Sequence, residues 1–436
     1  MNAYESTKES FLPWVGKIPT HWKITRMKNI LQNVSEKNHP DATVLSLYRE
    51  YGVLPKNSRD DNHNVTSLDT ASYKFVRIGE LVINKMKAWQ GSVGISDYEG
   101  IVSPAYYVCK FITDDVDKKY FHYLLRCKTY AQEFERLSTG MRIGQWDLGI
   151  NDFMCIPALI PPKSEQTAIA KYLDDQYAKI NALIAEVKES IEEYKQCKAS
   201  LIFEAVTKGL DPNAEMRDSG VKWIVKIPTH WNIVRLKDLF SFSKGLPITK
   251  SDLSEVGIPV VSYGQIHAKT NTGTHLSDDL LRYVPSKYLE SNADCLIKYG
   301  DIVLADTSED LTGLGNAVLM DRTEPVFAGY HTIIMHPINV NNSKYISYLL
   351  RTDCWRFQLR SNASGIKVFS ATQKMLKTCN AILPPIKEQK SIVDYLDKKC
   401  SAIDEIISGK TAVIENMTKY KQSLVYEVVT GKRKVV

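Results

Sequence analysis

Two stretches of this chain occur twice, and the order of the copies constrains the fold more than any other feature. Residues 17–31 (KIPTHWKITRMKNIL) return at 226–240 (KIPTHWNIVRLKDLF), with nine of fifteen positions identical. Residues 161–175 (PPKSEQTAIAKYLDD) return at 384–398 (PPIKEQKSIVDYLDK), with eight of fifteen identical. Each half of the chain therefore begins and ends with a repeated stretch. We call residues 17–31 and 226–240 the opening frames, and residues 161–175 and 384–398 the closing frames.

The stretches between these frames differ. Residues 32–160 and 241–383 show no obvious common register, and the second stretch is 14 residues longer. Residues 208–220 are expected to link the halves. A duplicated scaffold with two different inserts indicates a protein that recognises two different things at a fixed separation.

The segment after each Pro-Pro pair has the pattern of a long helix. Residues 164 to about 208 contain no Gly or Pro, and apolar residues recur at an average spacing of about 3.5, as in coiled coils. Gly209 and Gly431 favour helix ends. The predicted seam of the first helix consists of Ile169, Leu173, Ile180, Leu183, Val187, Tyr194 and Leu201, and that of the second consists of Ile392, Leu396, Ile403, Ile406, Val413, Met417, Tyr420 and Leu424.

Such a helix cannot bury its seam alone, so each copy is expected to pair with the other. Spacing does not decide between a parallel and an antiparallel pair, but duplication favours an antiparallel one with an insert domain at each end. Polar seam positions such as Gln176, Lys399 and Lys410 either fix the register or face solvent. Apolar residues at the helix ends, such as Ile202 and Val425, are either end packing or a partner surface.

The inserts have the pattern of mixed α/β domains. Short β-branched and aromatic runs between Gly, Asn and Asp predict strands, and helical patterns follow at 117–137 and 342–359. The predicted fold class is α+β, with two mixed α/β recognition domains joined by two long antiparallel coiled-coil helices in a pseudo-twofold arrangement. The strands are expected at 80–84, 91–96, 106–111, 301–305 and 332–336.

Composition narrows the class of protein. The chain is 44% apolar and 24% charged, which is typical of globular proteins, and a formal charge of +6 favours nucleic-acid binding only weakly. No apolar run of 18 residues predicts a membrane span, and the N-terminus lacks the order of a secretory signal. Eight scattered cysteines without a C-x-x-C pair favour reduced thiols in a cytoplasm over disulfides or a zinc site.

No catalytic motif is evident. The sequence has neither the G-x-x-x-x-G-K-[ST] phosphate loop nor a G-x-G-x-x-G after a strand. The Pro-Pro pairs lack the amide or acid and the aromatic residue of an adenine methyltransferase tetrad. His21 and His230 occupy the same frame position, which favours a structural role. We therefore expect a non-catalytic chain without a cofactor or a metal.

The ordered set of motifs, present twice, resembles the specificity (S) subunit of type I restriction–modification systems over essentially the whole chain. The carrying residues are Ile-Pro…His-Trp at 18–22 and 227–231, and Pro-Pro…Glu-Gln at 161–166 and 384–389. Segments within the inserts, at 84–91, 100–106 and 300–309, also resemble that family.

The resemblance implies two target recognition domains that each read one half of a split site in double-stranded DNA. It also implies that the long helices set the gap between half-sites and dock two copies of a methyltransferase (M) subunit, which translocating endonuclease (R) subunits join for cleavage. The expected domains are a first target recognition domain at 1–162, a first helix at 163–208, a linker and second target recognition domain at 209–385, and a second helix with tail at 386–436.

Base readers in the major groove are typically Arg, Lys, Asn, Gln, Ser and Thr, and phosphate contacts use similar side chains. Arg142 and Lys367 occupy corresponding places in the two halves and are the strongest single candidates, although the neighbouring aromatics can also be core residues. The candidate DNA-binding residues are Lys85, Lys87, Gln90, Ser103, Tyr106, Arg142 and Gln145 in the first insert and Lys244, Tyr263, Gln265, His331, Lys367 and Gln373 in the second.

Two other functions fit the same pattern. One is a stand-alone tandem DNA-binding regulator, and the other is a coiled-coil scaffold whose inserts bind protein. Co-purification with a methyltransferase distinguishes the first alternative, and a salt-dependent shift with duplex DNA distinguishes the second.

Overall fold

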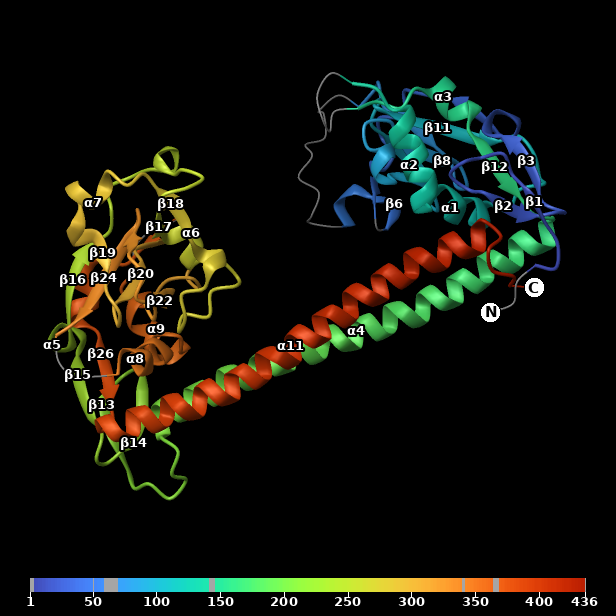
Figure 1. Ribbon diagram of the computed structural model, residues 1–436. Coiled ribbons are helices and arrows are strands. Elements are labelled where there is room, and N and C mark those ends of the chain that lie inside the picture. Colours follow the sequence, from blue (N-terminus) through green and yellow to red (C-terminus); the bar gives the residue numbers. More distant parts are fainter. Residues whose placement is uncertain are drawn as a thin grey trace. The chain divides into compact units, whose positions relative to one another are not determined.

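The computed structural model describes residues 4–49, 51–58, 70–140, 146–338, 342–363 and 368–435. It divides into two compact units (Figure 1). The first unit contains residues 1–188 and 410–436, and the second contains residues 189–409. Each unit therefore combines a recognition domain with parts of both long helices.

The long helices are α4 (Lys163–Lys208) and α11 (Ile386–Val429), and they run antiparallel. In the first unit, Lys421 of α11 donates to Asn181 of α4 over 2.9 Å. In the second unit, Lys198 of α4 donates to both carboxylate oxygens of Asp404 of α11, over 2.6 Å each. The start of each helix thus packs beside the end of the other, as the sequence predicts.

Glycine ends both helices. Gly209 and Gly431 have φ of +80° and +71°, a region that L side chains rarely adopt. A Cβ on Gly431 would lie 2.2 Å from Pro19 Cδ, and one on Gly209 would lie 3.2 Å from a ring carbon of Trp231. The helix ends therefore pack closely against the opening frames, which explains why glycine occurs at both positions.

Burial along the helices corrects part of the predicted seam. Ile169, Leu173, Ile180, Ile392, Leu396, Ile403 and Leu424 are buried, and Val187, Tyr194, Leu201 and Met417 are half-buried. By contrast, Leu183, Ile406, Val413 and Tyr420 are 40–49% exposed. The side chains that turn inward at these points are the next ones along the chain, namely Ile184, Ile407, Ile414 and Lys421.

Alternate predicted positions are thus one residue early, whereas the positions between them, such as Val187, Tyr194 and Met417, keep the predicted phase. From Ile180, a step of three reaches Leu183 and a step of four reaches Ile184, and both are apolar, so spacing alone could not choose. Ile191 is buried where the predicted phase had Ser190, and Cys400 is buried where it had Lys399. Ile202 and Val425 are also buried, which identifies them as end packing.

Each unit contains a four-stranded antiparallel sheet with equivalent strand order. In the first unit the order is β4 (Leu31–Val34), β11 (Tyr106–Phe111), β8 (Leu81–Asn84) and β9 (Val93–Ile95). In the second unit it is β16 (Phe240–Lys244), β24 (Thr332–Pro337), β20 (Ile302–Ala305) and β22 (Ala317–Leu319).

Smaller elements complete each unit. The first adds β1 (Thr7–Glu9), β2 (Lys17–Pro19), β3 (Lys23–Arg26), β5 (Leu45–Tyr48), β6 (Gly52–Pro55), β7 (Lys74–Val76), β10 (Gly100–Val102), α3 (Ile150–Cys155) and β12 (Pro157–Ile160). The second adds β13 (Met216–Val221), β14 (Ile224–Pro228), β15 (Asn232–Arg235), α5 (Leu236–Leu239), β17 (Ile258–Val261), α6 (Tyr263–Ile266), β18 (Arg282–Val284), α7 (Tyr288–Ser291), β19 (Leu296–Ile297), β21 (Thr307–Ser308), β23 (Val326–Ala328), β25 (Phe369–Ser370), α10 (Gln373–Thr378) and β26 (Asn380–Leu383).

Each helical stretch within an insert is two helices, not one. In the first unit, α1 (Lys118–Arg126) and α2 (Lys128–Leu137) are separated by Cys127, whose backbone is extended. In the second unit, α8 (Ser343–Leu350) is followed by α9 (Asp353–Arg360), and the extended Thr352 caps α9 by accepting from Trp355 N. No glycine or proline marks either break, so the amphipathic pattern continues across it.

The core of each unit includes residues from both long helices. In the first unit, Trp22 and Tyr120 are buried with Leu173 of α4 and Val428 of α11. In the second unit, Trp231 and Tyr345 are buried with Val206 of α4 and Leu396 of α11. The largest cluster of each unit thus depends on the long helices, whereas smaller clusters, around Val82 in the first domain and around Val303 in the second, consist of domain residues alone.

Candidate nucleic-acid interface

The repeated frames form the same hydrogen-bonded clamp in both units. In the first, Trp22 Nε1 donates to Glu165 Oε1 over 3.1 Å, and His21 Nε2 lies 2.8 Å from Glu165 Oε2. In the second, Trp231 and His230 contact Glu388 over the same distances. Both indoles are fully buried, whereas both imidazoles are about half exposed. The His-Trp motif and the Glu of Pro-Pro-x-x-Glu-Gln therefore join the opening strands to the helix starts.

A buried tyrosine joins each domain to its closing strand and to the end of one long helix. Tyr120 OH donates to Leu159 O over 2.9 Å and lies 3.5 Å from Val429 O of α11. Tyr345 OH makes the equivalent contacts with Ile382 O at 3.2 Å and with Val206 O of α4 at 3.1 Å. These contacts fix the orientation of the domain on its helix pair, and with it the direction in which the sheet edge faces.

In the first unit, predicted site residues gather at the edge where β8 ends. Lys85, directly after β8, accepts from Leu148 N at its carbonyl over 3.0 Å. Its ammonium lies 2.7 Å from Asp147 Oδ2, and this hydrogen bond raises the pKa of Lys85. The rings of Trp89 and Trp146 lie 5.3 Å apart beside it. Residues 146–148 therefore dock onto the turn that follows β8.

The second unit uses the equivalent edge, where β20 ends. Asp306, directly after β20, accepts from Ala371 N at its carbonyl over 2.8 Å. His331 lies opposite, with Nδ1 3.3 Å from Asp306 Oδ1 and a left-handed φ of +55°. The ring of Tyr263 lies 5.3 Å from that of His331 and 5.5 Å from that of Tyr330.

The two edges have the same backbone but different side chains. The contact between residues 148 and 85 corresponds to that between residues 371 and 306, because each joins the segment before the closing frame to the end of a central strand. The first edge has an ion pair and two indoles, whereas the second has an acid and three aromatic rings. A constant backbone with variable side chains is an arrangement suited to reading two different surfaces.

The sequence matches the model of the type I restriction modification DNA specificity domain at residues 19–193 and again at residues 228–416. The chain belongs to this family. Because its members are specificity subunits, which carry recognition and not chemistry, the chain is a non-catalytic specificity subunit.

Relatives of this DNA specificity family align over most of the chain. The type I restriction enzyme MjaVIII specificity subunit of Methanocaldococcus jannaschii is 24% identical over 445 residues, which cover 98% of this chain and 97% of that protein. The EcoKI specificity subunit of Escherichia coli is 23% identical over 307 residues, covering 66% and 61%.

A solved structure shows the same fold. One chain from a study of complex assembly and conformational transition of the type I restriction–modification system superposes with a TM-score of 0.67 at 14% identity. The superposition covers 94% of this chain and 98% of that one. The α+β fold is therefore shared with a chain of a type I restriction–modification system.

The remaining site candidates of this specificity subunit differ in how they are held. Lys87 and Lys244 are exposed, and Ser103, Tyr106 and Gln373 are half-buried. Gln265 caps its own helix, because its Oε1 accepts from Ser262 N over 3.2 Å, and Gln90 accepts from Arg49. Arg142, Gln145 and Lys367 lie outside the described residues.

Sequence reasoning did not select several basic side chains around these edges. Lys74 donates to Tyr106 O, and burial lowers the pKa of its ammonium. Arg49 and Arg126 also lie near the first edge, where Arg126 donates to Arg49 O. They belong to no repeated motif, so only their positions in space reveal them.

Two further features bear on the class of site. Over the described ranges, no three His, Cys, Asp or Glu side chains are grouped so that they could hold a metal ion. Of the helices in the part of the chain that the structure describes, none is both long and apolar enough to cross a bilayer.

Proposed function

We propose that this chain is the DNA-recognition subunit of a type I restriction–modification complex, and that each unit reads one half of a bipartite site through its sheet edge. The equivalent pair of edges carries this proposal. The same backbone contact presents Lys85, Asp147 and two indoles in one unit and Asp306, His331 and Tyr263 in the other. Two chemically different edges predict two different half-sites.

The proposal extends to the candidates at and beside these edges. Lys85, Lys87, Gln90, Ser103 and Tyr106 serve the first half-site, and Lys244, Tyr263, Gln265, His331 and Gln373 serve the second. Arg142, Gln145 and Lys367 belong to the segments that precede residues 146–148 and 368–371 in sequence. We propose Arg142 and Lys367 as base readers, each of which contributes about 1–3 kcal/mol to discrimination at its half-site.

The partners proposed for the chain follow from its relatives. The relatives are named as specificity subunits of type I restriction enzymes. In line with the resemblance to that family, we propose that this chain assembles with methyltransferase and endonuclease subunits. The equivalent clamps and helix ends in the two units favour two methyltransferase copies, one for each half, with endonuclease subunits joining them. The antiparallel helices would set the spacer between half-sites, and a cytoplasmic location would give the complex access to DNA.

An exchange of one insert tests this function. Residues 32–160 are replaced by the corresponding insert of a relative, and the modified sites in host DNA are mapped by methylation sequencing. We expect one half of the recognised site to change and the other half to stay. A change in both halves contradicts the modular reading, and DNA binding without any modification favours a stand-alone regulator.

A further inference from the structure

The sheet edge of the second unit carries a carboxylate at the end of its central strand. Asp306 directly follows β20, and two backbone hydrogen bonds fix its position. Its N donates to His331 O over 3.0 Å, and its carbonyl accepts from Ala371 N over 2.8 Å. The Asp306 side chain is 33% exposed. The backbone therefore holds this carboxylate at the surface of the edge for which we propose contact with DNA.

The equivalent residue of the first unit is a cation. Lys85 directly follows β8, and its carbonyl makes the same backbone contact with the segment before the closing frame. Asp147 lies one residue before that contact, and Ser370 lies at the same place in the second unit. The first edge thus has a lysine and an aspartate where the second edge has an aspartate and a serine.

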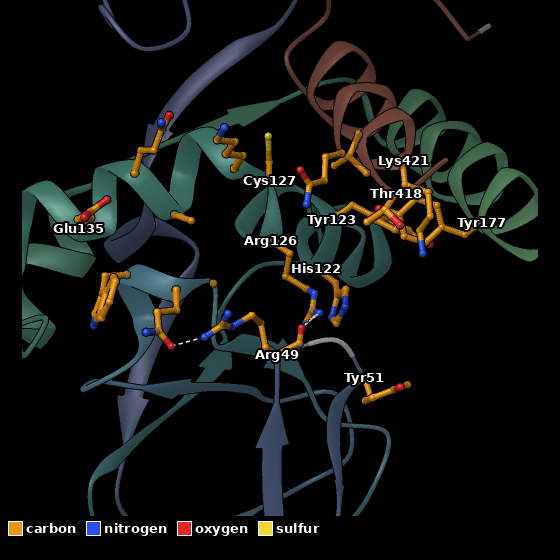
Figure 2. A pocket seen from close by; sticks show the side chains of 18 residues that line it. Arg49, Tyr51, His122, Tyr123, Arg126, Cys127, Glu135, Tyr177, Thr418 and Lys421 are labelled. Atoms are coloured by element: carbon orange, nitrogen blue, oxygen red, sulfur yellow. Dashed lines mark hydrogen bonds between the residues drawn. The ribbon is translucent and has the colours of Figure 1, made fainter. Parts of the chain in front are cut away.

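At the first edge, side-chain acceptors are paired with cationic donors of the same unit. Lys85 Nζ donates to Asp147 Oδ2 over 2.7 Å. Arg49, in the wall of the pocket shown in Figure 2, donates to Gln90 Oε1 in the turn that follows β8. A carboxylate oxygen and an amide oxygen of this edge are therefore held by strong donors without DNA.

At the second edge, the carboxylate meets a weaker donor. Among the residues that the structure describes, His331 is the one whose side chain contacts the Asp306 carboxylate, with Nδ1 3.3 Å from Oδ1. This distance is longer than in most protein hydrogen bonds. The His331 ring is itself held beside Tyr263, 5.3 Å away. The imidazole therefore orients one oxygen of Asp306, and the other oxygen, Oδ2, needs a donor from elsewhere.

Duplex DNA offers few donors to such an oxygen. Its phosphates are negatively charged and only accept hydrogen bonds, so they repel a carboxylate. In the major groove the donors are the N4 amino group of cytosine and the N6 amino group of adenine, whereas guanine and thymine present acceptors. The amino group of adenine lies beside the acceptor N7, which opposes a carboxylate. Cytosine is therefore the base that best suits an aspartate.

We infer that Asp306 is a specificity-determining residue of the second unit, which accepts a hydrogen bond from the N4 amino group of a cytosine in the second half-site, with His331 as the positioning residue of its carboxylate. This inference rests on the proposed function and extends it from an edge to one base. A carboxylate that loses water at the DNA surface needs a donor in exchange, because an unpaired charged group is costly to desolvate. Lys85 has only donors, so the first unit does not select cytosine in this way.

Two substitutions test the inference, and both keep the backbone hydrogen bonds of residue 306. Asp306→Ala removes the acceptor. Asp306→Asn keeps the shape and adds an N–H donor, which suits the N6 and N7 atoms of adenine. Asp310→Asn is the matched control, because the Asp310 carboxylate accepts from Gly313 N over 2.7 Å within its own loop. Full-length chain, assembled with its methyltransferase partner, selects duplexes from a random library, and the base frequencies are compared.

We expect the wild type to select cytosine at one position of the second half-site, Asp306→Ala to lose that preference, and Asp306→Asn to prefer adenine there. Affinity for the cytosine duplex should fall about tenfold in Asp306→Ala. The first half-site should stay the same in every variant, and Asp310→Asn should select the wild-type sequence.

A modified duplex tests the contact itself. N4-methylcytosine still pairs with guanine but has a methyl group in place of the N–H that faces the major groove. At the selected position it should weaken the wild type about as much as Asp306→Ala does, and it should leave the affinity of Asp306→Ala unchanged. Inosine opposite the cytosine removes the minor-groove amino group and should have no such effect.

The possible outcomes separate the inference from the proposed function. If the wild type prefers its selected duplex but both Asp306 variants keep every base preference, the inference is wrong and the proposed function stands. An equal loss of affinity on all duplexes, or a loss caused by inosine and not by N4-methylcytosine, also overturns it. If the wild type shows no sequence preference, the proposed function itself fails. Thermal melting checks folding, and Asp306→Asn alone decides the result if Asp306→Ala does not fold.

Discussion

The two copies of the repeat in this specificity subunit are alike at the clamps and different at the sheet edges. The clamps of the two units share two contacts, since Trp22, His21 and Glu165 meet at the same distances as Trp231, His230 and Glu388. In the first unit Tyr4 also donates to Glu165. At the edges only the backbone contact is shared. A structure duplicated in this way keeps the contacts that join domain to helix and varies the side chains at the sheet edge.

The largest effect should come from changing the helices that the two units share. A seven-residue insertion after Lys188 and another after Val413 lie at the same level of the antiparallel pair, as the contacts of Asn181 with Lys421 and of Lys198 with Asp404 define it. One heptad keeps the seam in phase. It lengthens the pair by roughly 10 Å, which is about three base pairs at ~3.4 Å each.

We expect this variant to lose most of its affinity for the original site and to select a longer spacer, with both half-sites unchanged. Selection from a library with randomised spacer length measures the preference. A single inserted heptad in α4 alone is the control, because it destroys the pairing. An unchanged spacer in a folded variant that binds DNA would show that the units are not separated by the helices.

The second prediction tests whether the clamps are energetically equivalent. Trp22→Ala and Trp231→Ala each empty a fully buried site and remove a hydrogen-bond donor from Glu165 or Glu388. Each should destabilise its own unit by about 3–5 kcal/mol. Urea unfolding monitored by hydrogen exchange in each unit gives the two values.

The exposed members of the same clamps are natural controls for this comparison. His21→Ala and His230→Ala should cost no more than about 1 kcal/mol, because exposed ion pairs contribute little. The two tryptophan substitutions should lower the unfolding free energy of their units by similar amounts. If the two losses differ by more than the histidine substitutions cost, the clamps pack differently despite their matching distances.

The third and smallest effect concerns acid stability, where the units differ at one residue. His122 of the first unit has a pKa of about 4, against about 6.5 for an unfolded histidine. Because the folded pKa is lowered, its contribution is fully present above pH 6.5 and is lost as the pH falls towards 4. Across that window it steepens the loss of stability by at most about 1.4 kcal/mol per pH unit.

His122→Asn removes this proton uptake while keeping an acceptor for Ile95 N. We expect a shallower dependence of the first unit's unfolding free energy between pH 4 and 6.5, and the same stability profile above that range. Ser347 occupies the equivalent position of the second unit and does not titrate. We therefore expect Ser347→Ala to leave the pH dependence of that unit's unfolding free energy unchanged. An unaltered slope in His122→Asn would mean that the imidazole is protonated in the folded state.

The repeats made the architecture predictable, but not the details that depend on packing. Nine shared positions in one frame and eight in the other were enough to place two domains on two paired helices. The predicted seam was wrong where Leu183 and Ile184 are both apolar, because only packing against the partner helix decides which of the two is buried. The breaks at Cys127 and Thr352 were missed, because neither residue is a helix breaker by type.

The sequence predicted which segments contain candidate site residues, but not which side chains come together at the sheet edges. Lys85, Tyr263 and His331 came from local composition, and their grouping depends on which strands are neighbours.

The last residues of the chain belong to the core of its first unit. Leu424, Val425, Val428 and Val429 are buried there with Trp22 and Tyr120. A ribosome that adds roughly 5–20 residues per second needs about 10–45 seconds to pass from residue 188 to residue 410. During that time the nascent first domain lacks the part of its core that α11 supplies. Synthesis therefore makes all residues of the second unit before the core of the first is complete, because residues 424–429 are translated after residue 409.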